Sequence, residues 1–114
     1  MALTRNFKET VIERVNRDPA FAKALLDEAS RLFLSGEPET ARLILRDLVN
    51  ATIGFEGLAI AIDTPPKSLH RMLSQRGNPS MDNIAAIFSA VCKNLNVQIE
   101  TTVIDARKKK RALA

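Results

Sequence analysis

The chain has 114 residues, of which 46% are hydrophobic and 26% are charged, a balance typical of one globular domain that needs no metal or disulfide for its core. Cys92 is the only cysteine, which excludes a disulfide framework and a multi-cysteine zinc site within one chain. No apolar run approaches membrane-spanning length, and residues 1–17 alternate charged with hydrophobic residues where a signal peptide has an apolar core. We therefore expect a cytoplasmic protein that contacts no membrane.

The net charge of +4 belongs to the C-terminal end of the chain. Residues 1–104 carry 12 basic and 12 acidic side chains, whereas residues 105–114 carry five basic side chains and one acidic side chain. The basic pI is therefore poor evidence that the body of the domain binds nucleic acid. We predict that residues 105–114 form a basic flexible tail. Such a run is most often a solvated tail, and nonspecific phosphate binding is the functional alternative.

Residues 1–104 are predicted to form a single helical domain, in which residues 1–36 make a helical extension of two helices. Thr4 can start the first helix, and Asp18, followed by a proline, is typical of the N-cap of the second. Gly36 ends that second helix. A third helix begins with a proline at position 38 and opens a unit that extends over residues 38–95.

Two short helices joined by a tight turn are predicted within that unit. Their apolar stripes consist of Leu58, Ala59 and Ile62 in the first helix and Leu69, Met72 and Leu73 in the second. Each helix is too short to be stable alone, so both must bury these stripes against neighbours. Asp63 occupies the turn, where a left-handed backbone is often needed, and Pro65 and Pro66 stop the first helix and suit the start of the second.

A longer amphipathic helix and a β-branched segment follow. Ser80 can cap the helix, whose apolar residues continue to Leu95. Residues 97–104 are rich in β-branched residues and alternate with a period of two, which predicts a strand in an otherwise all-α chain. A single strand has no ladder partner in the rest of the sequence, so we expect it to pair with the same strand of a second subunit in a homodimer. The residues expected at this contact are Val97, Ile99, Thr101 and Val103.

Residues 54–92 resemble the lambda-repressor-like helix-turn-helix family, also called the Xre or Cro/C1 type. The residues that carry the resemblance are Leu58-Ala59, Leu69, Arg71-Met72, Gly77-Asn78-Pro79-Ser80, Ile84 and Ile87. More narrowly, the length of the chain and the segments 36–40 and 68–73 resemble small HigA-like antidote proteins of toxin–antitoxin modules. The resemblance implies a lambda-repressor-like fold and an autoregulatory DNA binder, usually dimeric, with a small toxin as partner. The acidic residues available for such a toxin on the first two helices are Glu9, Glu13, Asp27 and Glu28.

The expected DNA-binding residues lie in an 18-residue stretch, 64–81, that contains no Asp or Glu. They are Lys67, Ser68, His70, Arg71, Arg76 and Asn78. Arg71 is the first candidate for bidentate recognition of a guanine, and Lys67 and Ser68 can touch bases or the adjacent phosphates. His70 can donate or accept one hydrogen bond. Arg76 and Asn78 are expected to hold phosphates, which positions the protein without specifying the sequence read.

Plainer interpretations stay open for the same residues. Lys67 and Arg71 can be the solvated face of a short helix, and His70 can be a surface residue without function. A protein-interaction module that keeps the helix-turn-helix shape without reading DNA is the alternative function. Phe55 supports it, because many relatives carry at this position a glutamine that touches a phosphate. An enzyme is not expected, since the only histidine and the only cysteine lie in separate predicted helices, and we expect neither a metal nor a cofactor.

Overall fold

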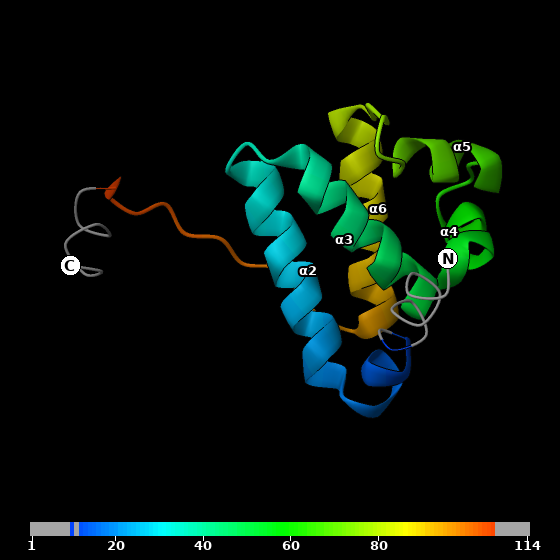
Figure 1. The fold of residues 1–114 in the computed structure, drawn as a ribbon, viewed down its shortest axis with the longest axis horizontal. Helices are drawn as coiled ribbons and strands as arrows, with labels where there is room; N and C mark the ends of the chain where they lie inside the picture. The colour runs from blue at the N-terminus through cyan, green and yellow to red at the C-terminus, as the bar shows by residue number, and fades with distance from the viewer. Residues whose placement is uncertain (1–9, 11, 107–114) are drawn as a thin grey trace.

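The computed structural model describes residue 10 and residues 12–106, and its regular elements are all helical. A first helical segment covers 12–17. The helices that follow are α2 (Pro19–Leu34), α3 (Pro38–Ala51), α4 (Gly54–Ala61), α5 (Pro66–Met72) and α6 (Met81–Leu95). In Figure 1, α2 and α3 run side by side, α6 passes behind them, and α4 and α5 lie together at the opposite end from α2. The predicted all-α class is therefore confirmed for the described residues.

Local capping signals set the helix boundaries. The Asp18 side chain accepts a hydrogen bond from the Ala20 amide at 3.1 Å, so it is the N-cap of α2 as predicted. Gly36 has a φ of +89°, a conformation that favours glycine, and it separates α2 from Pro38, the first residue of α3. Ser80 accepts from the Asn83 amide at 3.1 Å and caps α6. The predicted start at Thr4 lies outside the described residues.

One core joins all five of these helices. Its largest side chains that are almost fully buried are Leu45, Leu48 and Val49 of α3, Leu58 of α4, Leu69 of α5, the adjoining Leu73, and Ile87 and Val91 of α6. α2 adds small and apolar residues to the same cluster, and the rings of Phe33 and Phe88 meet edge to face at 5.6 Å. Because α4 and α5 each bury a leucine in this core, the orientation of their outer faces is fixed.

The predicted strand at 97–104 is not formed in this structure. α6 ends at Leu95, and its C-cap Asn96 is left-handed with a φ of 56°. The chain then continues without regular structure through residue 105, and we call residues 97–106 the C-terminal arm. Val97 and Ile99 are partly buried against the core of their own chain, whereas Thr101 and Val103 are exposed. A strand needs a neighbour for its hydrogen bonds, and the described part of one chain offers none. Pairing with a second subunit stays a prediction.

None of the helices within the described ranges combines the length and the apolar character required to cross a lipid bilayer.

Candidate nucleic-acid interface

The turn between α4 and α5 has the conformation that its sequence predicts. Asp63 is left-handed, with a φ of 53°. The Ile62 amide donates to the Leu58 carbonyl at 3.0 Å, and the Thr64 amide donates to the Ala59 carbonyl at 3.0 Å, so these two carbonyls in the last turn of α4 are satisfied. Pro65 is extended, with φ −60° and ψ 141°, and the next proline starts α5. The turn thereby sets the direction in which α5 leaves α4.

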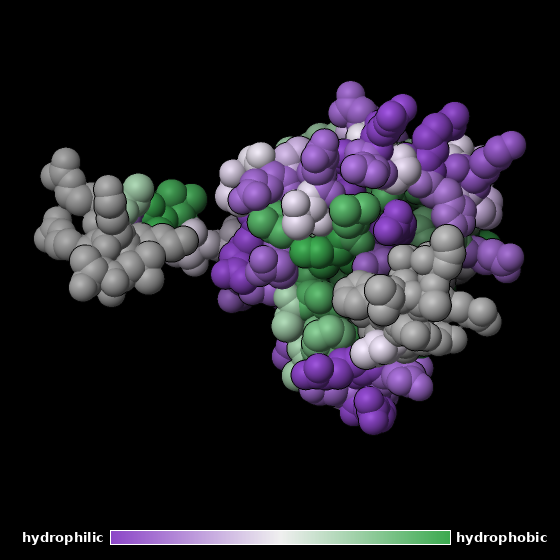
Figure 2. All heavy atoms as spheres, viewed as in Figure 1, coloured by the Kyte–Doolittle hydropathy of each residue, from purple (hydrophilic) through white to green (hydrophobic). Residues whose placement is uncertain are grey.

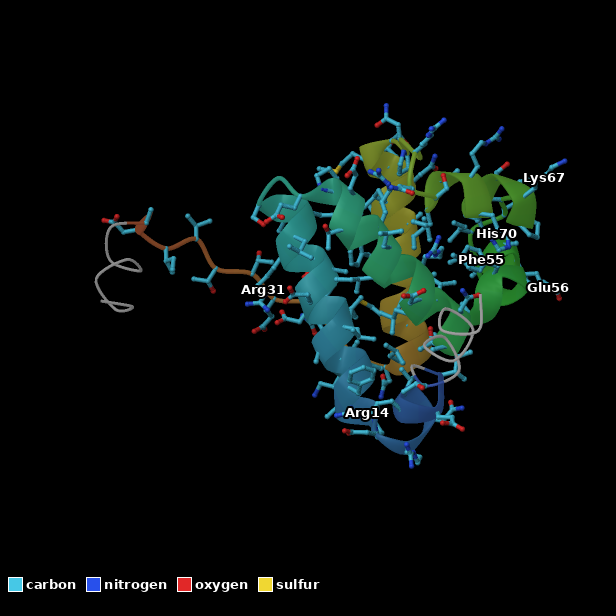
Figure 3. All side chains as sticks on the ribbon, viewed as in Figure 1. Arg14, Arg31, Phe55, Glu56, Lys67 and His70 are labelled. Atoms are coloured by element: carbon cyan, nitrogen blue, oxygen red, sulfur yellow. The ribbon has the colours of Figure 1, made fainter. Side chains whose placement is uncertain are left out.

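α5 has one buried side and one solvent side. Leu69 and the adjoining Leu73 are completely buried, and Met72 packs partly buried against the same core. Among the residues predicted to bind DNA, Lys67, His70 and Arg71 are exposed, and Ser68 is partly buried. Figure 3 shows Lys67 projecting from the outer end of α5. The structure therefore places these four residues on or beside one solvent-facing surface.

His70 lies flat against Phe55 of α4. The ring centroids are 4.0 Å apart and the ring planes differ by 18°, and Figure 3 shows the two side chains together between the helices. Phe55 itself is buried, so it forms a fixed platform for the imidazole. Stacking uses the face of the imidazole and leaves its two nitrogens at the ring edge, where they can form hydrogen bonds. No local sequence pattern predicts this contact, because the two residues belong to different helices.

A buried arginine of α3 holds the loop that follows α5. Arg42 is 7% exposed, its Nε donates to the Ser74 carbonyl at 3.3 Å, and its Nη2 donates to the Gln75 carbonyl at 3.1 Å. A positive charge is favourable beside the carbonyl end of a helix. Sequence reasoning missed Arg42, although its spacing from the buried Leu45 and Val49, three and seven residues later, places it on the inner side of α3.

The loop of residues 74–78 turns back closely on the end of α5. The Gly77 amide donates to the Ser74 carbonyl at 3.1 Å, and a Cβ atom at Gly77 would press against the carbonyl oxygens of Arg71 and Met72. Glycine is therefore required here by close approach of the backbone. Arg76 and Asn78 are exposed on this loop, next to the exposed side of α5. The structure thus brings all six predicted DNA-binding residues onto α5 and the loop that follows it.

The charges of this surface are of one sign over the length of α5 and its loop. Lys67, Arg71 and Arg76 form no ion pair with any described residue. Acidic side chains occur in the chain on either side of this stretch, at Glu56 in the first turn of α4, at Asp63 in the turn and at residue 82 in the first turn of α6. Figure 2 shows hydrophilic side chains projecting over α5 and the connection to α6. Such a surface suits a polyanion.

The described residues contain no group of three histidine, cysteine, aspartate or glutamate side chains that could hold a metal ion. Cys92 lies on α6, away from the surface just described, and burial raises the pKa of its thiol. A raised pKa keeps the thiol protonated near neutral pH and lowers its reactivity. The chain matches no protein-family model, no curated protein and no solved structure.

Proposed function

We propose that the protein is a sequence-specific DNA-binding transcriptional regulator that inserts α5 into the major groove. The observation that carries the proposal is the set of three exposed cations, Lys67, Arg71 and Arg76, on a helix and loop that contain no acidic residue. α5 is anchored from behind by buried leucines, so its outer side chains have a fixed base. A major groove about 12 Å wide admits one α-helix. The resemblance to the lambda-repressor-like helix-turn-helix family supports the same proposal.

The side chains divide by the part of DNA that each can reach. Arg71, on the exposed side of α5, offers two parallel donors for the O6 and N7 of a guanine. Lys67 and Ser68 contact bases or phosphates near the start of the helix. The ring of His70, held by Phe55, presents one donor or acceptor at a fixed orientation. Arg76 and Asn78, on the following loop, bind phosphates and so set the register of the helix.

A homodimer suits this mode of recognition. Two copies related by a two-fold axis can set their recognition helices about 34 Å apart and read the two halves of a palindrome in successive major grooves. We propose that the C-terminal arm supplies the contact, with residues 97–104 of two chains pairing as antiparallel strands. Occupation of a promoter palindrome by such a dimer represses transcription by excluding polymerase.

The resemblance to HigA-like antidotes supports a narrower proposal, that the regulator is an antitoxin that represses its own operon and binds a small toxin. The toxin would bind away from α5, on the first helical segment and α2. Glu13 is exposed there, while Asp27 and Glu28 pair with Arg31 at 3.6 Å and 2.8 Å. Glu9 lies outside the described residues. Co-expression with the neighbouring reading frame tests the proposal, because failure of the two proteins to co-purify would remove the antitoxin role and leave the regulator.

The first test of the regulator is the salt dependence of binding to DNA from upstream of its own gene. Each phosphate contact should lower the logarithm of the binding constant by about 0.9 per unit of log salt concentration. Arg76→Ala should weaken binding to all sequences alike and reduce this slope by about one per subunit, because it removes one phosphate contact. A gel shift or anisotropy titration over a salt series measures both quantities. Absence of binding at low salt would contradict the proposal.

A helix-turn-helix module that binds protein and not DNA is the second candidate, and the Phe55–His70 stack favours it. By the resemblance, Phe55 stands where many members of the family carry a glutamine that touches a phosphate, and its ring covers one face of His70 instead. The same titration separates the two candidates. A protein-binding module would show at most weak binding, equal for all sequences.

A further inference from the structure

An open apolar groove lies where α2, α3 and α6 meet the C-terminal arm. It has a volume of about 340 Å³, and Ile99 and Thr101 of the arm form one side of it. Its other apolar walls include Phe33, Leu34, Pro79, Met81, Ile84 and Phe88, and the polar side chains of Arg42 and Asn78 also line it. Leu34 and Met81 are 68% and 75% exposed, so the described chain leaves this hydrophobic surface uncovered.

The C-terminal arm has exposed apolar side chains and backbone amides that donate no hydrogen bond to another described residue. Val103 is 99% exposed and Ile104 is 55% exposed, and Figure 1 shows this part of the arm extending away from the helices. Within the described chain, no backbone amide from 98 to 104 donates a hydrogen bond. Thr101 is the last residue of the arm that lines the groove. Val103 of the same chain lies two residues, or about 7 Å of extended chain, beyond it and so does not fill the groove. The arm therefore presents an unpaired backbone edge together with uncovered apolar side chains.

We propose that the groove is filled by the C-terminal arm of a second copy of this chain. The two arms pair antiparallel about a two-fold axis at Thr101, so that Val103 of the partner lies opposite Ile99. Directly opposed residues of an antiparallel pair project from the same side of the ribbon. Because Ile99 faces the groove, the partner's Val103 faces it as well. This inference rests on the dimeric regulator proposed above and specifies its subunit contact.

The charges of the arm select this register over its neighbours. A two-fold axis at residue 100 would oppose two copies of Glu100, and like charges directly opposite each other destabilise a strand pair. An axis at residue 102 would place the carboxylate of Asp105 opposite Ile99, against the apolar groove, where burial of a charge is costly. With the axis at Thr101, Glu100 faces Thr102 of the partner, and the partner's Asp105 lies opposite Val97, which does not line the groove. The register about Thr101 is thus the one of the three that buries apolar side chains without opposing like charges.

Mass measurement by light scattering on the full chain tests the contact. The parent protein should be a dimer, and Val103→Asn should raise the dimer dissociation constant on the order of tenfold or more, because two buried valines are lost per dimer. Thr102→Asn, one residue away on the opposite face of the arm, is the matched control. Met81→Asn should act like the change at Val103, whereas Ile60→Asn removes an apolar side chain that is 83% exposed and lies outside the groove, so the dimer should persist.

Cross-linking tests the register. In a Cys92→Ser background, Thr101→Cys should give an interchain disulfide under mild oxidation, because opposed residues have Cα atoms about 4.5 to 5.5 Å apart. Thr102→Cys should not, since its two copies are diagonal. The proposal is overturned if the protein is a monomer at all concentrations. It is also overturned if the dimer is unaffected by both Val103→Asn and Met81→Asn, or if it cross-links only through residue 102. DNA binding separates this inference from the proposed function. A cross-linked dimer that binds no DNA refutes only the proposed regulator, and a monomer that binds a half-site refutes only the pairing of the two arms.

Discussion

At the scale of single residues, Arg42 supports the proposed interface although it does not face solvent. Its guanidinium holds the Ser74 and Gln75 carbonyls, and these begin the loop that carries Arg76 and Asn78. The proposed phosphate contacts therefore depend on a side chain that touches no DNA. The Phe55–His70 stack has a similar effect, since it restricts the orientation of one ring by resting it on another.

Arg42→Met should lower the free energy of unfolding by about 1 to 3 kcal/mol, because two carbonyls lose a charged donor while the apolar stem is retained. Arg46→Met is the matched control, one turn further along α3. The Nε of Arg46 is buried without a hydrogen-bond partner and lies 3.9 Å from the Asp47 carboxylate, so its removal should cost less than about 1 kcal/mol. Urea denaturation of the two variants measures the difference. Equal losses in both variants would show that the contact with the loop adds no stability.

At the scale of elements, α5 is a seven-residue helix that depends on its neighbours. An isolated helix of this length is unstable in water, so its geometry comes from the burial of Leu69 and the adjoining Leu73. Leu69→Ala should destabilise the protein by about 2 to 5 kcal/mol through lost burial and a residual cavity. Ile60→Ala, at a position that is 83% exposed, should change stability by less than about 0.5 kcal/mol. Thermal unfolding measures both, and a small effect of Leu69→Ala would mean that α5 is not anchored as described.

The elements also show how far the sequence predicts this fold and site. The N-cap at Asp18, the prolines that open α3 and α5 and the cap at Ser80 are local signals, and the structure has helices where they indicate. Arg42 contacts residues 32 and 33 positions away, and the partner of His70 lies in another helix, so no local pattern reveals either contact. The strand at 97–104 was wrong for a single chain because a strand depends on a neighbour that the pattern alone does not supply.

At the scale of the whole molecule, the proposed DNA surface and the groove beside the arm meet at the loop that follows α5. Asn78 belongs to both, but no residue of α5 lines the groove, which lies between α2, α3, α6 and the arm. Two copies joined through their arms can therefore leave both copies of α5 free. A dimer of this kind requires an operator whose half-sites are separated by about one helical turn, or 34 Å, or a multiple of it. Footprinting of the upstream region determines that spacing. A single site without a symmetry-related repeat would contradict recognition by a two-fold symmetric dimer.

The most direct test of the central claim, that α5 reads DNA sequence, is the ratio of specific to nonspecific binding constants for the parent, Arg71→Ala and Arg76→Ala at one fixed salt concentration. A bidentate arginine–guanine contact contributes roughly 1 to 3 kcal/mol of discrimination, so Arg71→Ala should reduce the ratio by at least about fivefold. Arg76→Ala should weaken both binding constants and leave their ratio unchanged, since phosphate contacts carry no sequence information. If Arg71→Ala retains the parent's ratio, α5 is not the element that reads the sequence.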